Sequence, residues 1–173
     1  MIGDISGKGI AAALLMANLQ ANLCSQFALA REQPQLFLRS VNQLFYENTV
    51  ESAYATIFFA DYNDRTLKLR YSNCGHLSAL LLRQEDTLEQ LHSTGTVLGL
   101  FRDWEGPTVE SQLCFGDTLA LYTDGVTEAC NEQGEEFGET PRRGAQTPSQ
   151  AERAILCRCD SRGSPALHRL LKN

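Results

Sequence analysis

The chain has 173 residues, of which 43% are hydrophobic and 21% are charged, as in a globular protein with one sizeable core. Its formal net charge of −6 argues against a nucleic-acid partner, because phosphate neutralisation needs a basic face. The longest apolar run, around residues 11–17, is too short to span a bilayer, and no secretion signal is evident. We therefore expect a cytoplasmic protein with no nucleic-acid and no membrane partner.

The balance of charge changes near residue 140. Residues 1–139 carry a formal charge of −11, whereas residues 140–173 carry +5 and are rich in Arg, Ser, Pro and Gly. The second segment has only a short apolar pattern with which to form a core. We therefore predict a folded domain over 1–139 and a basic, poorly ordered tail over 140–173.

Two helices are expected in the first third of the chain. A glycine-rich turn is followed by residues 11–27, where apolar side chains recur at i+4 and predict one buried stripe: Leu15, Leu19, Leu23 and Phe27. Pro34 suits the first turn of a second helix over 34–46, because its φ is fixed and it lacks a donor. The expected inner face of this second helix is Phe37, Val41, Leu44 and Phe45.

From residue 54 the pattern changes to that of β-strands. Residues 54–60 are rich in β-branched and aromatic side chains, 63–66 have turn composition, and 67–71 alternate between apolar and charged residues. This pattern predicts an antiparallel hairpin, with further strands at 79–82, 88–91, 109–115 and 118–123. Helices followed by short strands indicate the α+β class.

The first chemically suggestive segment is GDISGKGI at residues 3–10, where one acid precedes a glycine-rich turn that opens a helix. Glycines allow the backbone to approach a ligand closely, and a helix N-terminus favours anions. A P-loop is the alternative, but Gly3 and Gly7 enclose three residues rather than four, and Lys8 is followed by Gly9 rather than Ser or Thr. With no strand expected before the turn either, the segment argues against a nucleotide site.

The second suggestive segment is DTLALYTDGVTEA at residues 117–129. An apolar strand runs to Thr123, and Asp124 follows with Gly125 permitting a sharp exit, so that the carboxylate lies at the rim of a sheet. An ordinary Asp-Gly turn has the same appearance. The acid becomes a candidate ligand only if a second acid converges on it.

Several linked motifs resemble one known family. They are GDISGKGIAAALLMA (3–17), YSNCGHLSALL (71–81), TGTVLGL (94–100), LYTDGVTEA (121–129) and GEEFG (134–138). Their order and approximate spacing resemble those of protein-phosphatase-2C-like (PPM) domains of the SpoIIE/RsbU branch, and the resemblance covers residues 2–139. It implies an antiparallel β-sandwich flanked by antiparallel helices.

The resemblance also implies a centre with two Mn²⁺ or Mg²⁺ ions. Asp4 matches the acid that bridges both ions, Ile5 would contribute its backbone carbonyl, and Asp124 matches the acid on the second ion. Hard divalent cations prefer such oxygen ligands. A bridged pair polarises a phosphate and generates a hydroxide nucleophile at neutral pH, so no catalytic cysteine is needed.

The residues that neighbour the two acids would shape turns, bind substrate or support the fold. Gly7, Gly9 and Gly125 would shape the turns beside the acids, while Lys8 either meets substrate charge or is a solvated turn residue, the latter being favoured. His76 has a suitable pKa range for a general acid, but the family pattern puts it at a structural corner between strands. We expect a structural histidine.

The implied activity is metal-dependent hydrolysis of phosphoserine or phosphothreonine on a protein, the typical substrate in this branch being an anti-sigma-factor antagonist. The alternative is an inactive phosphatase-like module that binds a signalling partner. Family members start with strands that include a GlyGlyAsp-type acid and end with an AspAsp segment, and this sequence matches neither. We therefore expect a partial domain, incomplete at both termini, with weak metal affinity and impaired activity.

Overall fold

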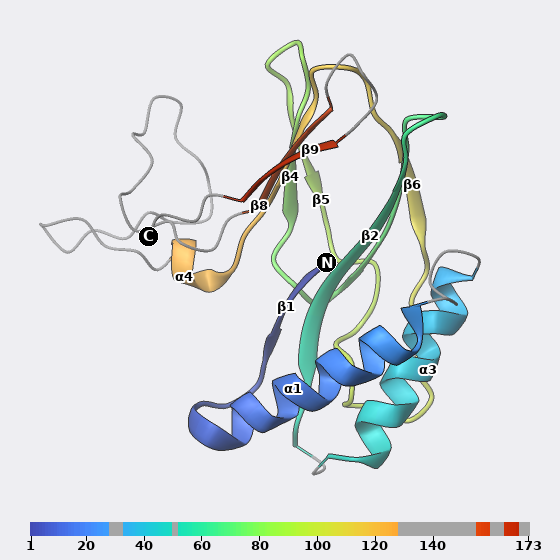
Figure 1. Cartoon of the computed structure of the whole chain (residues 1–173), viewed down its shortest axis with the longest axis vertical. Helices are drawn as coiled ribbons and strands as arrows, with labels where there is room; N and C mark the ends of the chain where they lie inside the picture. The colour runs from blue at the N-terminus through green and yellow to red at the C-terminus, as the bar shows by residue number, and fades with distance from the viewer. Residues whose placement is uncertain (28–32, 50–51, 128–154, 160–164, 170–173) are drawn as a thin grey trace, which may run out of the picture. The chain divides into compact units, whose positions relative to one another are not determined.

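The computed structural model describes residues 1–27, 33–49 and 52–127, and the backbone of 155–159 and 165–169. The chain forms two compact units. The first contains residues 1–76 and 92–112, and the second contains residues 77–91 and 113–173. Each unit has its own antiparallel sheet (Figure 1).

The sheet of the first unit has four strands in the order β1-β2-β3-β6. They are β1 (Ile2–Ile5), β2 (Ala55–Asn63), β3 (Lys68–Cys74) and β6 (Val109–Gln112). All neighbours pair antiparallel, and β1 lies at one edge of the sheet, next to β2. The first carboxylate motif therefore begins on an edge strand.

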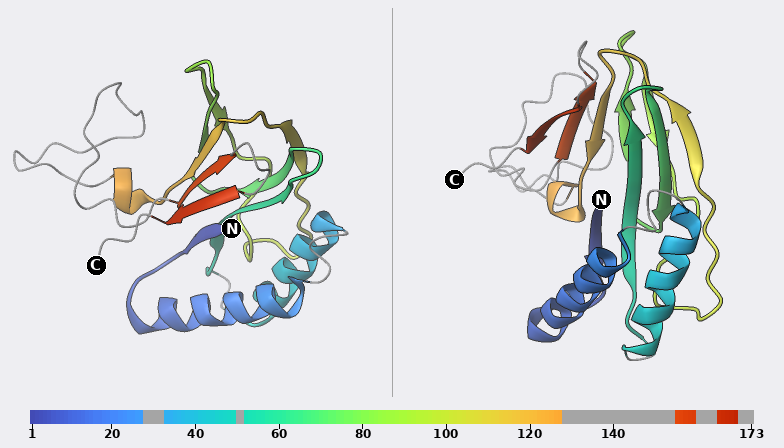
Figure 2. Two further views of the ribbon diagram at one scale, coloured as in Figure 1. Left: turned by 45° about the horizontal axis from the view of Figure 1, so that its top comes forward. Right: turned by 45° about the vertical axis from the view of Figure 1, so that its right-hand side comes forward.

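Two helices, α1 (Gly9–Ser25) and α3 (Pro34–Glu47), lie against one face of this sheet (Figure 2). Alternate β2 residues face them, and the Phe37 and Phe59 rings lie 5.2 Å apart across the contact. Burial of an aromatic or aliphatic side chain of this size contributes about 1.5–3 kcal/mol. The core contains Ile5, Leu19, Leu23, Phe37, Leu38, Val41, Phe45, Ala55, Ile57, Phe59, Cys74, Leu98 and Trp104.

Two buried polar side chains hold the segment 92–108, which precedes β6, in the first unit. The Asn42 side chain is fully buried on α3, where it accepts a hydrogen bond from the Gly99 N–H (2.8 Å) and donates to the Phe101 carbonyl (3.0 Å). The indole N–H of Trp104, a residue only 2% exposed, donates to the Thr96 carbonyl at 2.9 Å. This loop is therefore part of the core of the first unit.

The sheet of the second unit has five strands in the order β5-β4-β7-β8-β9. They are β4 (Ala79–Leu82), β5 (Leu88–Leu91), β7 (Thr118–Leu121), β8 (Ile155–Cys159) and β9 (Pro165–Arg169). One short helix, α4 (Asp124–Thr127), follows β7. The second carboxylate motif therefore bridges a central strand and a helical turn.

The α+β class with antiparallel sheets is confirmed, and β4 and β5 have the predicted bounds. The strands β6 and β7 begin where predicted but end earlier, at Gln112 and Leu121 rather than at 115 and 123. Two further details of the prediction were wrong. A strand, β1, does precede the glycine turn. Phe27 is 60% exposed and does not continue the buried stripe of α1.

The stretch 140–173, expected to have little order, contains β8 and β9. The strand β8 pairs with β7, directly before the Asp124 segment. The domain boundary at residue 139 stays a prediction, and residues 128–154 lie outside those described. Within the described part of the chain, no helix combines the length and apolar character needed to cross a membrane.

Candidate active site

Asp4 lies on β1, directly opposite Thr56 of β2. Side chains alternate between the faces of a strand, so Asp4 and Thr56 share the face opposite the helices, while Ile5 packs in the helix-facing core. A Cβ on Gly3 would lie 2.6 Å from the Thr56 carbonyl oxygen. Only glycine at this position lets β1 lie close enough to β2 to hold Asp4 in this register.

Ser6 fixes the backbone immediately after Asp4. Its N–H donates to the Tyr54 carbonyl, and its hydroxyl accepts from the Tyr54 N–H, both at 2.9 Å. In an antiparallel pair hydrogen-bonded and non-hydrogen-bonded positions alternate, so the N–H and C=O of Ile5 point away from β2. The Ile5 carbonyl, predicted as a metal ligand, is therefore directed to the edge of the described sheet.

The turn between β1 and α1 has the backbone conformation that its glycines suggest. Gly7 and Gly9 have φ values of 93° and 79°, in the left-handed region that side chains disfavour. Lys8 lies between them, is exposed, and precedes the helix without a side-chain cap. The first turn of α1 therefore begins with N–H groups that no side chain caps, directly after Lys8.

The oxygen atoms around Asp4 are suitable ligands for a hard divalent cation. The Asp4 side chain is exposed, and its carboxylate has no hydrogen-bond or ion-pair partner among the described residues. A carboxylate with a neighbouring outward backbone carbonyl offers the oxygen ligands that Mn²⁺ and Mg²⁺ prefer. No group of three or more His, Cys, Asp or Glu side chains that could hold a metal ion occurs within the described ranges.

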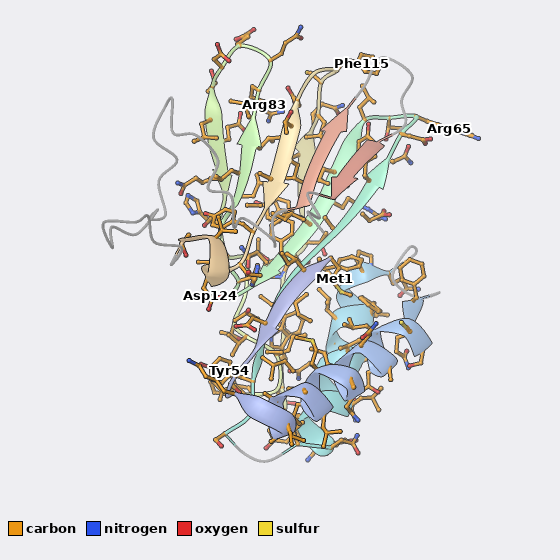
Figure 3. All side chains as sticks on the ribbon, turned by 60° about the vertical axis from the view of Figure 1, so that its left-hand side comes forward. Met1, Tyr54, Arg65, Arg83, Phe115 and Asp124 are labelled. Carbon is orange, nitrogen blue, oxygen red and sulfur yellow. The ribbon has the colours of Figure 1, made fainter. Side chains whose placement is uncertain are left out.

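Asp124 begins α4 rather than simply ending a strand. Its Oδ1 accepts a hydrogen bond from the Gly125 N–H at 2.8 Å, and its carbonyl accepts one from the Thr127 hydroxyl at 3.0 Å. The carboxylate is exposed at the start of α4 (Figure 3). The preceding Thr123 hydroxyl is buried with no hydrogen-bond partner among the described residues. A donor beside the acid is thus left for a further ligand or chain segment.

The predicted site residues therefore fall into two groups. The structure brings together Asp4, Ile5, Gly7, Lys8 and Gly9 in one strand–turn–helix of the first unit. Asp124 and Gly125 belong to the second unit. Each group is described within its own unit, and the two-acid centre stays a prediction.

A thiol nucleophile at Cys74 is excluded. Cys74 is fully buried, and burial raises the pKa of its thiol to about 12. The group is therefore protonated at neutral pH, where a nucleophilic cysteine would need to be a thiolate. Any hydrolysis near this strand must use another nucleophile.

The family model described as Stage II sporulation protein E (SpoIIE) matches residues 1–161. The phosphoserine phosphatase RsbU of Bacillus subtilis (strain 168) is 33% identical over 141 residues, which are 81% of this chain and 41% of RsbU. The chain belongs to the SpoIIE family. It spans about two fifths of the length of this relative.

Solved structures confirm the expected fold for this SpoIIE-family chain. The SiaA-PP2C domain of Pseudomonas aeruginosa has a TM-score of 0.66 at 21% identity, with 79% of this chain and 55% of that chain covered. The catalytic domain of the serine/threonine protein phosphatase PstP, solved with two manganese ions, has a TM-score of 0.59 at 15% identity, with 82% and 76% covered. The chain therefore has the PP2C phosphatase fold.

Three residues near Asp4 were missed as site-forming by the sequence analysis. Gly3 and Ser6 lie within the first motif, which was itself a usable signal. Thr56 lies in an apolar strand whose sequence gave no sign that it faces Asp4. Its place follows only from the β1–β2 register.

Proposed function

We propose that this SpoIIE-family chain hydrolyses phosphoserine or phosphothreonine on a protein substrate, with a divalent metal ion. The observation that carries the proposal is the exposed Asp4 carboxylate, which lacks a partner among the described residues and precedes a turn with two glycines at positive φ. An exposed acid on a constrained backbone is suited to bind a cation rather than to stabilise the fold. The kinship with RsbU, a phosphoserine phosphatase, supports the same activity.

Each site residue has a role in this proposal. Asp4 and Asp124 would hold Mn²⁺ or Mg²⁺ with the Ile5 carbonyl, and two such ions in a PP2C relative support this chemistry. A bound divalent ion supplies charge neutralisation for the phosphate and a water of lowered pKa. Gly7 and Gly9 allow the turn after Asp4 through their positive φ, Gly125 follows Asp124 within α4, and Lys8 is available to an anionic substrate.

The proposed substrate is a phosphorylated protein, and within that class an anti-sigma-factor antagonist. The support is the 33% identity to RsbU and the structural likeness to the SiaA-PP2C domain. The formal charge of −6 is consistent with a protein partner rather than a nucleic acid. A cytoplasmic location is part of the same proposal, since such a substrate would be met there.

The test is Mn²⁺-dependent release of phosphate from a phosphoserine peptide by the 173-residue chain. The variants Asp4→Asn and Asp124→Asn should each reduce the rate by at least about 10³-fold, because a lost metal ligand removes several kcal/mol of transition-state stabilisation. Asp64→Asn is the matched control, because Asp64 is an exposed acid in the β2–β3 turn. The control should retain the unaltered rate.

The outcomes separate enzyme from binding module. Turnover that depends on both acids supports the proposal, even if it is slow. A chain that retains a phosphorylated partner in a pull-down but releases no phosphate with any divalent ion would support the non-catalytic alternative. Turnover that survives Asp4→Asn would place the site elsewhere.

A further inference from the structure

The face of the first sheet that carries Asp4 also carries a buried polar group. Asp4 and Thr56 are register partners, and Phe58 and Asn73 are partners one pleat further along on the same face. The Thr56 hydroxyl is joined to His76 Nδ1 by a hydrogen bond of 2.9 Å. His76 is 7% exposed, so this contact lies largely out of solvent.

The NCGH motif at residues 73–76 holds His76 in this position. The Asn73 side chain, itself fully buried, accepts a hydrogen bond from the His76 N–H at 2.9 Å. Gly75 has a φ of 70°, and a Cβ there would lie 2.6 Å from Val97 Cγ1. Cys74 points into the helix-facing core. Asn73 and Gly75 therefore shape the corner that places the His76 ring against Thr56.

The Thr56 hydroxyl is consequently fixed in direction. A threonine hydroxyl has one donor and two acceptor positions, and His76 occupies only one of these in either ring tautomer. Side chains directly opposite each other on an antiparallel pair have Cβ atoms about 4.5–5.5 Å apart. Thr56 and Asp4 share no direct hydrogen bond in the structure. The remaining hydrogen-bonding positions of the Thr56 hydroxyl therefore lie within reach of the Asp4 carboxylate through one water molecule.

We propose that Thr56 and His76 are positioning residues that orient the Asp4 carboxylate for divalent metal binding, His76 acting through the Thr56 hydroxyl. This inference rests on the proposed function, because it assigns Asp4 to a metal ion. No hydrogen bond or ion pair with another described residue restricts the Asp4 side chain. Hydrogen-bonding partners behind a metal ligand commonly change metal affinity by 10–100-fold.

A purely structural role for His76 predicts something different. A hydrogen bond that only ties β2 to the corner at residues 73–76 would affect stability and leave the metal affinity of the folded chain unchanged. The distinguishing measurement is therefore the Mn²⁺ dissociation constant of the folded protein, obtained by isothermal titration calorimetry without substrate. Far-UV circular dichroism verifies that each variant is folded.

Matched variants test the hydroxyl and the ring nitrogen separately. Thr56→Val keeps the shape and removes the hydroxyl, and should weaken Mn²⁺ binding about 10–100-fold, whereas Thr56→Ser keeps the hydroxyl and should stay within about threefold. His76→Asn retains a polar atom near the Nδ1 position and His76→Leu does not. We expect His76→Asn to bind Mn²⁺ more tightly than His76→Leu.

A double variant provides a further check. If His76 acts through Thr56, then adding His76→Leu to Thr56→Val should weaken Mn²⁺ binding by less than about twofold beyond Thr56→Val alone. Thr56→Val with unchanged Mn²⁺ affinity would overturn the inference. So would fully multiplicative losses in the double variant.

Asp4→Asn separates this inference from the proposed function. Loss of Mn²⁺ binding in Asp4→Asn together with unchanged binding in Thr56→Val would reject only the positioning pair. Unchanged binding in Asp4→Asn would reject the metal site at Asp4 and the positioning pair together. Weakened binding in both variants supports both.

Discussion

The unit that carries Asp4 and the unit that carries Asp124 are stabilised by different interactions. All buried aromatic side chains among the described residues belong to the first unit, where Phe37, Phe45, Phe59 and Trp104 pack in the helix-facing core and Phe58 stacks on Tyr71 on the opposite face of the sheet. The buried apolar residues described in the second unit are aliphatic, and an ionic group is buried with them. The two halves of the proposed centre therefore should respond differently to core truncation, salt and pH.

The ionic group of the second unit is centred on Asp117, just before β7. Its side chain is 1% exposed and accepts from Arg83 Nη1 (2.8 Å), the Cys114 N–H (2.9 Å) and the Gln84 N–H (3.2 Å). Arg83 (labelled in Figure 3) also donates from Nε and Nη2 to the two Glu89 oxygens, both at 2.8 Å. These bonds, chiefly the one to Glu89, raise the pKa of Arg83. They tie β4, β5 and the turn before β7 together.

The largest effect on stability is expected from truncating the aromatic core of the first unit. Phe45 is fully buried, and its ring lies so close to Gly99 that a Cβ on the glycine would be 2.4 Å from Cδ1. Phe45→Ala should reduce the free energy of unfolding by about 3–5 kcal/mol, measured by urea denaturation with circular dichroism. Phe115→Ala, at a side chain 47% exposed in the second unit, should change it by less than about 0.5 kcal/mol. Equal losses of unfolding free energy in Phe45→Ala and Phe115→Ala would contradict the expectation that the first unit depends on its buried aromatic side chains.

Breaking the ionic group should have the next largest effect. Asp117→Ala leaves two backbone N–H groups without their acceptor and Arg83 with Glu89 alone, so we expect a loss of about 2–4 kcal/mol. Hydrogen exchange should accelerate in β4 and β7 more than in β2 and β3. The control is Asp61→Ala, which breaks a 2.7 Å ion pair with Arg70 at the surface and should cost less than about 1 kcal/mol. Uniform acceleration in both sheets would show that the units do not respond separately.

A smaller effect is expected from the buried amide of the first unit. Asn42→Ala removes the partners of the Gly99 N–H and the Phe101 carbonyl, and should cost about 1–3 kcal/mol by urea denaturation. Gln43→Ala on the same helix removes only an exposed hydrogen bond to Glu47. That control should lie within about 0.5 kcal/mol of the unaltered chain. A neutral Asn42→Ala would mean that the loop at 99–102 is not held by α3.

The smallest effect concerns the pH dependence of the second unit. The hydrogen bond from Arg83 lowers the pKa of Glu89, so its contribution is present above the unfolded-state pKa of about 4.3 and is lost as the pH falls further. The Glu89 side chain is 44% exposed, which limits the contribution to less than about 1 kcal/mol. The stability difference between Glu89→Gln and the unaltered chain should be present at pH 7 and decrease as the pH falls below about 4.3. A difference that increases in acid would contradict the assignment.

Sequence periodicity predicted the elements whose residues alternate or recur regularly. The face of α3 and the bounds of β4 and β5 follow from such patterns. The strand β1 was missed because it has four residues, two of which, Gly3 and Asp4, are poor strand formers. Its conformation depends on pairing with β2, more than fifty residues later.

Within the site, sequence motifs identified the acids and turns but not the residues behind them. Thr56 reads as one β-branched residue in an apolar strand, and Asn42 as one polar residue in a helix. Their roles depend on partners distant in sequence, His76 for Thr56 and Gly99 for Asn42. No local pattern encodes such contacts. Asp117 was likewise overlooked, because an Asp after Gly resembles an ordinary turn.

Trp104 gives this chain a natural optical probe. It is the only tryptophan in the sequence, and it is buried in the first unit against Gly106. Its emission therefore reports the environment of the unit that contains Asp4, while circular dichroism reports both sheets. Denaturation curves from the two signals will coincide if the units unfold together and separate if they do not. The protein can thus be assayed for cooperativity between the two halves of its proposed centre without any added label.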